Sequence, residues 1–322
     1  MPSPQPFPTT PLARLTDHKG PVHAVTFSAG TGQHVLTGCQ DRQVRLFNPN
    51  TRRLIQTYSA HGYEVLDLAV SEDNARFVSG GGDKTVFLWD VATAVTTRRF
   101  AGHAGRVNAV AFGGEGDGVV ISGSFDGTVK VWDAKSRSDR AICTFSEAKD
   151  AVSSIAVHGH EIFAGSIDGG VRVYDLAMGH VDSDVVAPGK GVTSVVPTKA
   201  GDGYLVSSLD STLRLMDRST GKCLQSFKDD SGFKNDTYRM RSALGMGDAY
   251  AFSGSEDGRV VVWDVLTGDV VHRLWHKEQL GSAINETPSK KDVVSAVAWN
   301  QLRKQWASAG GDGSVVVWGS TE

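Results

Sequence analysis

The chain has 322 residues and a formal net charge of −3. Because no basic excess marks it as a nucleic-acid binder, we expect no direct sequence-specific contact with nucleic acid. The cysteines Cys39, Cys143 and Cys223 are odd in number and far apart, which argues against a disulfide framework and favours a reducing compartment. No apolar stretch approaches the roughly 18 residues of a membrane span, so we expect no membrane contact.

Residues 1–10 contain four prolines, which predicts a disordered N-terminal arm. The remaining residues, 11–322, are dominated by a repeat and are expected to form one domain. An aspartate recurs seven times, and the sixth residue after each one is large and apolar. These aspartates are Asp41, Asp83, Asp126, Asp168, Asp210, Asp257 and Asp312. A period of about 40–45 residues, with Gly-His near its start and Trp-Asp near its end, predicts an all-β fold, a seven-bladed WD-repeat β-propeller.

Each repeat reads as four short strands separated by turn residues. In the second repeat these are Val65–Val70, Ala75–Gly80, Thr85–Asp90 and Thr96–Phe100. The last repeat ends at Trp318 after three strands, so its fourth strand must come from elsewhere in the chain. The run Leu12–Thr16 precedes His18 as Arg98–Phe100 precedes His103, and we predict that it joins the last blade and closes the ring.

Two of the repeats are longer than the others. The extra residues fall around 229–237 and around 276–291. The second segment is polar and has little strand character, which predicts a surface loop. Long loops in compact domains are usually functional or disordered, and both interpretations stay open here.

Two repeats carry a set of side chains that resembles a catalytic triad. The sets are His61, Ser79, Asp83 and Trp89 in blade 2, and His103, Ser122, Asp126 and Trp132 in blade 3. An active site is not normally built more than once around a ring, so we interpret each set as a buried chain of hydrogen bonds that stabilises its blade. Blades 4 and 5 lack the full set, and we expect them to depend more on packing.

The chain offers no recognisable catalytic or cofactor site. The histidines and cysteines show no metal-binding spacing, and Thr220–Cys223 resembles only the end of a phosphate-binding loop, so we expect no metal, no cofactor and no catalytic residue. The favoured function is therefore a scaffold that binds proteins. Two alternatives remain, a substrate receptor of a ubiquitin ligase and, with less support, a propeller hydrolase that acts at the central channel.

Several runs resemble one particular WD-repeat family, the mitogen-activated protein kinase organizers. They are Ala60–Asp67, Ser79–Lys84, Gly102–Asn108, Ala164–Gly169 and Leu205–Leu215. The resemblance implies a monomeric propeller within larger assemblies, present in the nucleus and the cytoplasm. Its expected partners are splicing factors of the spliceosome, components of the mitogen-activated protein kinase cascade, or both.

In propellers of this kind, partners commonly dock on one rim of the ring, at positions around the start of each first strand and just before the turn aspartate. Carried onto this chain, the positions include Pro21, His23 and Gln40 of blade 1, Glu64 and Leu66 of blade 2, Arg106, Asn108 and Phe125 of blade 3, Ile167 of blade 4, Leu209 of blade 5, and Arg239, Arg241 and Glu256 of blade 6. Phe125, Ile167 and Leu209 then form an apolar arc on neighbouring blades, or each covers only its own turn. Arg239 and Arg241 are either solvated surface residues or contacts for an acidic or phosphorylated partner.

Overall fold

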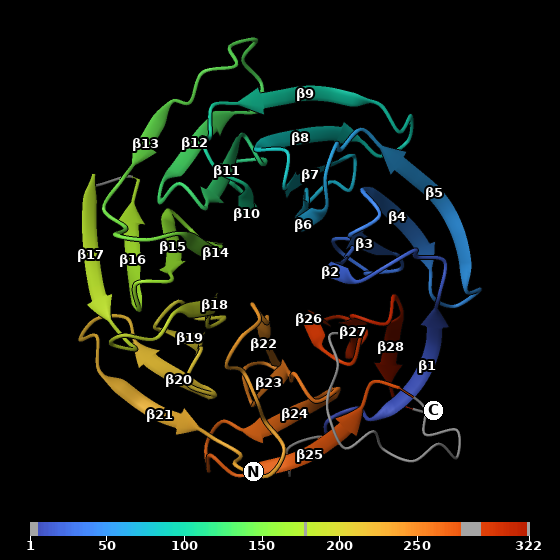
Figure 1. Cartoon of the computed structure of the whole chain (residues 1–322), viewed down its shortest axis with the longest axis vertical. Helices are drawn as coiled ribbons and strands as arrows, with labels where there is room; N and C mark the ends of the chain where they lie inside the picture. Colours follow the sequence, from blue (N-terminus) through green and yellow to red (C-terminus); the bar gives the residue numbers. More distant parts are fainter. Residues whose placement is uncertain (1–5, 177–178, 278–290, 321–322) are drawn as a thin grey trace.

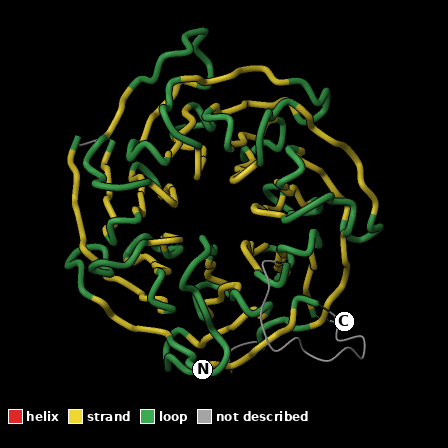
Figure 2. Tube along the Cα trace, viewed as in Figure 1, coloured by secondary structure: helices red, strands yellow, loops and turns green. Residues whose placement is uncertain are grey.

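The structure, a computed structural model, describes residues 6–176, 179–277 and 291–320. These residues form seven four-stranded antiparallel sheets arranged around a ring, and Figures 1 and 2 show the sheets as blades with strands and loops but no helix in this part of the chain. The predicted all-β, seven-bladed propeller is confirmed.

The blades follow one another along the chain. Blade 1 has β2 (Val22–Phe27), β3 (Val35–Cys39), β4 (Gln43–Asn48) and β5 (Arg53–Ser59), and blade 2 has β6 (Val65–Val70), β7 (Arg76–Gly81), β8 (Thr85–Asp90) and β9 (Thr96–Ala101). Blade 3 has β10 (Val107–Gly113), β11 (Val119–Ser124), β12 (Val129–Asp133) and β13 (Cys143–Phe145), and blade 4 has β14 (Val152–His158), β15 (Glu161–Ser166), β16 (Gly170–Asp175) and β17 (His180–Val185). Blade 5 has β18 (Val192–Pro197), β19 (Gly203–Ser208), β20 (Thr212–Asp217) and β21 (Cys223–Phe227), and blade 6 has β22 (Ser242–Gly245), β23 (Tyr250–Gly254), β24 (Arg259–Asp264) and β25 (Val270–Trp275). Blade 7 combines β26 (Val294–Asn300), β27 (Gln305–Gly310) and β28 (Val315–Gly319) with β1 (Thr10–Leu15).

Neighbouring blades pack through a glycine in the second strand of one blade and a valine in the first strand of the following blade. A Cβ atom added to Gly80 would lie 2.6 Å from Cγ1 of Val107, and one added to Gly123 would lie 2.5 Å from Cγ1 of Val152. No such atom fits at these distances, so the absent side chain lets the valine pack against the backbone. The Ser-Gly pair that recurs in the repeats therefore has a packing role between blades.

The ring is closed by the N-terminal strand. Strand β1 pairs antiparallel with β28, with Arg14 opposite Val316 and Leu15 opposite Val315. This pairing supplies the fourth strand that blade 7 lacks and covers the edge of β28. The predicted closure by the segment before His18 is confirmed.

The predicted disorder of the arm 1–10 is wrong for residues 6–10. Phe7 is 3% exposed and packs among the aromatic rings of blades 6 and 7, with centroids at 5.4 Å from Phe252, 5.6 Å from Trp306 and 5.9 Å from Trp299. The indole Nε1 of Trp306 donates to the carbonyl of Pro8 at 2.7 Å. The proline content suggested disorder, but one large aromatic side chain gains enough from burial to fix the segment. Residues 1–5 lie outside the described residues.

Candidate docking rim and channel mouth

The two predicted sets of side chains each form one hydrogen-bonded chain. In blade 2, Trp89 Nε1 donates to Ser79 Oγ at 2.8 Å, and His61 Nε2 lies 2.7 Å from the same Oγ. His61 Nδ1 lies 2.7 Å from Asp83 Oδ2. The serine oxygen is thus held between an indole and an imidazole inside the blade, with no exposed surface. Such a serine cannot reach a substrate, which favours the structural interpretation over the catalytic one.

Blade 3 repeats this geometry. Trp132 Nε1 to Ser122 Oγ and His103 Nε2 to Ser122 Oγ both measure 2.8 Å, and His103 Nδ1 lies 3.0 Å from Asp126 Oδ2. Burial lowers the pKa of His103 and outweighs the opposing charge of Asp126. Burial alone would raise the pKa of Asp126, but hydrogen bonds from Thr128 and the imidazole hold it well below its usual range. The network therefore pairs a neutral ring with an ionised carboxylate.

Blade 7 contains a network that the sequence analysis missed. His276 is 2% exposed, and its Nδ1 lies 2.8 Å from Ser308 Oγ, which also accepts from Trp318 Nε1 at 2.9 Å. Its Nε2 lies 3.0 Å from Ser314 Oγ and 3.6 Å from Asp312 Oδ1. His276 was assigned to the surface loop 276–291, whereas it lies inside the blade. Residues 278–290 of that loop lie outside the described residues.

In blades 1, 4 and 5 the turn aspartate has an arginine partner. The pairs are Asp41–Arg45 at 2.8 Å, Asp168–Arg172 at 2.7 Å and Asp210–Arg214 at 2.5 Å. Blades 4 and 5 were expected to depend more on packing, but each has a buried or half-buried ion pair at its turn in place of the missing set. The signal was present in the sequence, because an arginine follows the aspartate by four residues in these three blades.

The docking positions come together on one face because a main-chain hydrogen bond recurs from blade to blade. The amide before each turn aspartate donates to the carbonyl of the residue before the first strand. The bonds are Gln40 to Pro21, Gly82 to Glu64, Phe125 to Arg106, Ile167 to Ala151, Leu209 to Gly191 and Gly311 to Val293, all between 2.8 and 3.0 Å. We call the face formed by these residues the docking rim.

Ile167 and Leu209 lie close together, since a Cβ atom added to Gly191 would be 3.0 Å from one Cδ1 and 3.2 Å from the other. Phe125 is 55% exposed and carries the guanidinium of Arg106 over its ring at 5.0 Å. The sequence analysis missed a further residue of this face, Tyr63, which is 65% exposed beside Gly82.

At the centre of the docking rim, the mouth of the channel forms a pocket of about 340 Å³. Eight of its lining residues are predicted docking positions: Pro21, His23, Gln40, Glu64, Leu66, Arg106, Asn108 and Arg239. The structure thus gathers residues from blades 1, 2, 3, 6 and 7 around one cavity, which we call the mouth pocket.

The positions assigned to blade 6 need correction. The main-chain partner of Glu256 on the docking rim is Lys234, at 2.9 Å, and not Arg239. The extra residues before β22 form a separate segment, and Glu256 Oε1 holds it by accepting the amides of Asp236, Thr237 and Tyr238 at 2.6–3.0 Å. Arg239 and Arg241 follow this segment into the channel and are therefore not part of the outer rim.

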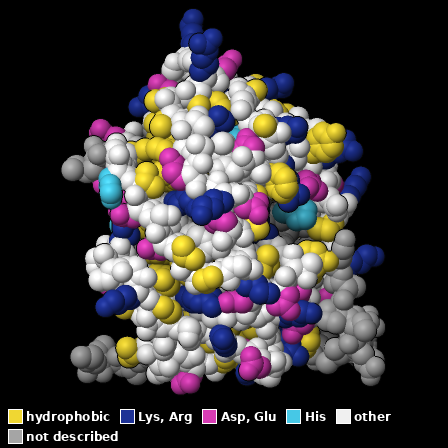
Figure 3. Space-filling view, turned by 60° about the vertical axis from the view of Figure 1, so that its left-hand side comes forward, with side chains coloured by type: hydrophobic (Ala, Val, Ile, Leu, Met, Phe, Trp, Pro, Cys, Tyr) yellow, Lys and Arg dark blue, Asp and Glu magenta, His cyan; other side chains and the backbone are white. Residues whose placement is uncertain are grey.

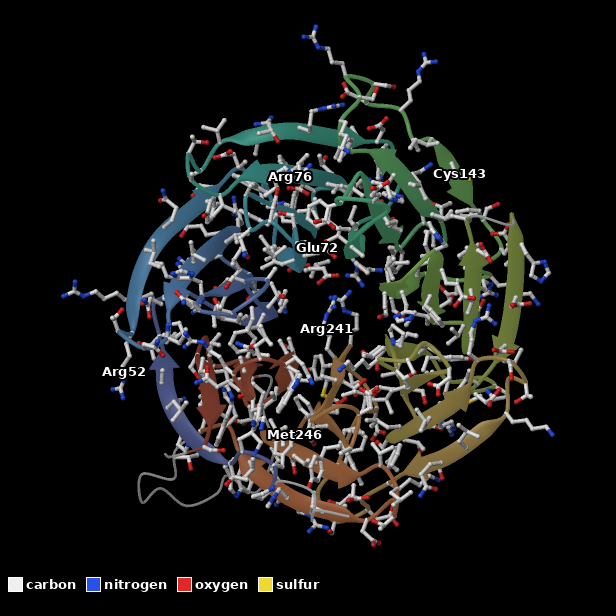
Figure 4. The ribbon with its side chains drawn as sticks, turned by 180° about the vertical axis from the view of Figure 1, so that it is seen from behind. Arg52, Glu72, Arg76, Cys143, Arg241 and Met246 are labelled. Carbon is white, nitrogen blue, oxygen red and sulfur yellow. The ribbon has the colours of Figure 1, made fainter. Side chains whose placement is uncertain are left out.

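Both arginines reach across the ring. Arg239 donates to the carbonyl of Leu66 at 2.7 Å and to that of Ser153 at 3.1 Å, and it also donates to the carbonyl of Asn108. Figure 4 shows Arg241 extending into the centre of the ring, where its Nη2 lies 2.8 Å from Asp67 Oδ1 of β6. The two side chains connect blade 6 to blades 2, 3 and 4 through the channel.

The electrostatics of the mouth pocket are those of a positive site. Burial, followed by the charge of Arg241, lowers the pKa of Arg239 to about 9. Burial and the charge of Arg239 lower the pKa of His23 to about 4, so its imidazole is neutral at pH 7. By contrast, the outer side of the ring in Figure 3 shows positive and negative side chains interspersed.

Within residues 6–176, 179–277 and 291–320, no group of three or more His, Cys, Asp or Glu is placed to hold a metal ion. None of these segments is a helix that could cross a membrane.

Comparisons with known proteins agree with the blade architecture. Residues 9–48, 52–90, 94–133 and 282–319 match the family model described as WD domain, G-beta repeat. WD repeat domain-containing protein 83 of Rattus norvegicus is 42% identical over 324 residues, covering 99% of this chain and 96% of that protein. Its Homo sapiens counterpart is 43% identical over 98% of this chain and 94% of its own length. Autophagy-related protein 16 of Arabidopsis thaliana is 28% identical over 97% of this chain but only 58% of that protein. From this similarity along nearly its whole length, the chain belongs to the WD-repeat family of WD repeat domain-containing protein 83.

Proposed function

We propose that this protein is a non-catalytic scaffold that binds other proteins on the docking rim. The observation that carries the proposal is the mouth pocket, because residues of five blades line it and exposed aromatic side chains flank it. Tyr63 and Phe125 are each more than half exposed on this face. Large aromatic residues next to arginines are the side chains that most often dominate protein interfaces.

The absence of a free catalytic set in the described residues supports the non-catalytic part. Each Ser–His–Asp set in blades 2 and 3 is closed by a tryptophan that donates to the serine. A general base needs an accessible nucleophile within hydrogen-bond reach, and these serines have no exposed surface. The side chains that resemble a catalytic triad therefore make their hydrogen bonds inside the blades and stabilise the fold.

We further propose that the assemblies served are the spliceosome, mitogen-activated protein kinase complexes, or both, in the nucleus and the cytoplasm. The support is the resemblance of the runs Ala60–Asp67 and Leu205–Leu215 to the kinase organizer family, since the fold does not demand either run. The partners would be splicing factors or kinase-cascade components.

The test is a paired affinity purification from cell extract with mass spectrometry. The double variant Phe125→Asp, Leu209→Asp places charges that would be buried unpaired on binding, and it should weaken the main partners by about thirtyfold or more. Arg137→Asp, in the exposed connection between β12 and β13 on the opposite face, is the matched control and should recover all partners. Circular dichroism must show that both variants fold.

Two results would count against the proposal. A folded double variant that still recovers every partner would place the principal docking surface elsewhere on the ring. Recovery of ubiquitin ligase subunits in place of splicing factors or kinases would favour the substrate-receptor alternative.

A further inference from the structure

The channel carries a positive charge that no described carboxylate neutralises directly. Arg239 makes its three hydrogen bonds to backbone carbonyls, which are neutral. The nearest acid, Asp67, is 2% exposed and is already engaged by Arg241 at 2.8 Å. Asp67 also accepts the amides of Leu68 at 2.7 Å and Val110 at 2.8 Å. Two of the five N–H groups of Arg239 remain outside these bonds.

Arg106 brings a second cation to the mouth pocket from the docking rim. It is exposed, and its described contact is with the ring of Phe125 at 5.0 Å, which holds the side chain in place without neutralising it. Glu64, on the blade 2 side, is the only acid among the lining residues described. Arg106 and Arg239 against Glu64 leave a net charge of about +1 in the pocket at pH 7.

A third group in the mouth pocket is a hydrogen-bonding nitrogen without a described partner. Nε2 of His23 is buried and finds none among the described residues. A buried polar atom left unpaired is costly, so a ligand that pairs with it gains affinity. The neutral imidazole can present an N–H there to an acceptor oxygen.

We propose that the mouth pocket binds the carboxylate of a single Asp or Glu side chain of a protein partner, held by Arg106 and Arg239 and facing His23. Guanidinium groups suit carboxylate geometry, and a pocket of about 340 Å³ accommodates one amino-acid side chain. A net charge of about +1 matches one carboxylate better than the nearly doubly charged phosphate of a phosphoserine. The inference rests on the proposed docking function and names the partner chemistry at its centre.

The experiment uses the full chain labelled with ¹⁵N in its histidines and three small probes followed by NMR. N-acetyl-glutamate amide carries one carboxylate, N-acetyl-glutamine amide is its neutral control, and N-acetyl-phosphoserine amide is the dianion. The His23 resonance is assigned by its loss in His23→Asn. The glutamate probe should shift this resonance saturably and raise the pKa of His23, because an anion stabilises the protonated ring.

The variants localise the site. Arg106→Gln should weaken binding of the glutamate probe about tenfold, the equivalent of one modest charge-assisted contact. Lys84→Gln removes another exposed cation, which lies two residues after Gly82 of the docking rim and does not line the pocket, and it should leave the dissociation constant unchanged. Arg239→Met should abolish the shift if circular dichroism shows an intact fold.

Each other outcome overturns the inference. Equal binding of the glutamine probe, or no effect of Arg106→Gln, would show that the pocket has no anion site. Tighter binding of the phosphoserine probe would assign it to phosphorylated partners. The probes are small molecules and need no protein partner, so the two proposals can fail separately. If the glutamate probe does not bind but the Phe125→Asp, Leu209→Asp variant loses its partners, only this inference is refuted. If the probe binds but that double variant still recovers every partner, only the proposed docking surface is refuted.

Discussion

Replacing Phe7 by alanine should destabilise the ring at its closure. The side chain is 3% exposed and contacts rings from two blades, with centroids 5.4 Å from Phe252 of blade 6 and 5.6 Å from Trp306 of blade 7. Removing a buried phenylalanine of this kind costs about 3–5 kcal/mol, from lost burial and from the cavity left behind. The loss should also loosen Pro8, which accepts from the indole of Trp306, and with it the start of β1.

The assay is urea denaturation followed by tryptophan fluorescence. Phe7→Leu keeps much of the apolar volume and should cost less than Phe7→Ala, whereas Leu266→Ala, at a residue 90% exposed, should stay within about 0.5 kcal/mol of wild type. A Phe7→Ala protein with an unchanged midpoint and slope would refute the anchoring role. It would favour the original prediction that this arm is disordered.

Three further predictions concern the networks. Asp83→Ala, which removes the acceptor of its histidine, should cost roughly 1–3 kcal/mol, and Asp210→Ala, which leaves its arginine unpaired, should lose a comparable amount in thermal melts; an Asp210→Ala protein that melts like wild type would contradict the second role. Burial, aided by a nearby arginine, lowers the pKa of His18 from 6.5 to about 4, so the unfolded state binds more protons in that window and the free energy of unfolding should fall as the pH drops through it. His18→Asn should flatten this dependence, and a pH-independent wild-type stability would speak against it. Arg241→Met leaves the buried Asp67 without its cation and should lower the free energy of unfolding, measured by urea denaturation, by about 3–5 kcal/mol. A loss under about 1 kcal/mol would mean that the Arg241–Asp67 ion pair contributes little to stability.

The repeat made the architecture predictable, because each blade is one unit with its own turn aspartate and large apolar residue. The hydrogen-bonded chains from Trp89 to Asp83 and from Trp132 to Asp126 were predictable for the same reason, since all of their members lie within one repeat. The pairing of the N-terminal strand with β28 followed from counting strands. These features depend on local order along the chain, which the sequence displays directly.

The wrong predictions concern residues that lie beside an insertion in a repeat or outside the repeats altogether. Arg239 was aligned to the rim by spacing, but the extra residues of blade 6 turn it into the channel, where its partners are carbonyls of three other blades. His276 was assigned to a loop because it lies next to a polar insertion. Phe7 was overlooked because its proline-rich neighbours suggested disorder. The partners of Arg239 and Phe7 are distant in the sequence, and no period predicts them. Ser308, Asp312 and Trp318 keep the spacing of Ser79, Asp83 and Trp89, and only the insertion after His276 hid their histidine.

The most direct test of the scaffold account is hydrogen exchange of the protein alone and in complex with its most abundant purified partner. The account predicts added protection in the rim segments that include Tyr63, Phe125, Ile167 and Leu209, with none in the turn between β12 and β13 on the opposite face. Protection confined to that turn or to the outer strands, with the docking rim unchanged, would contradict it.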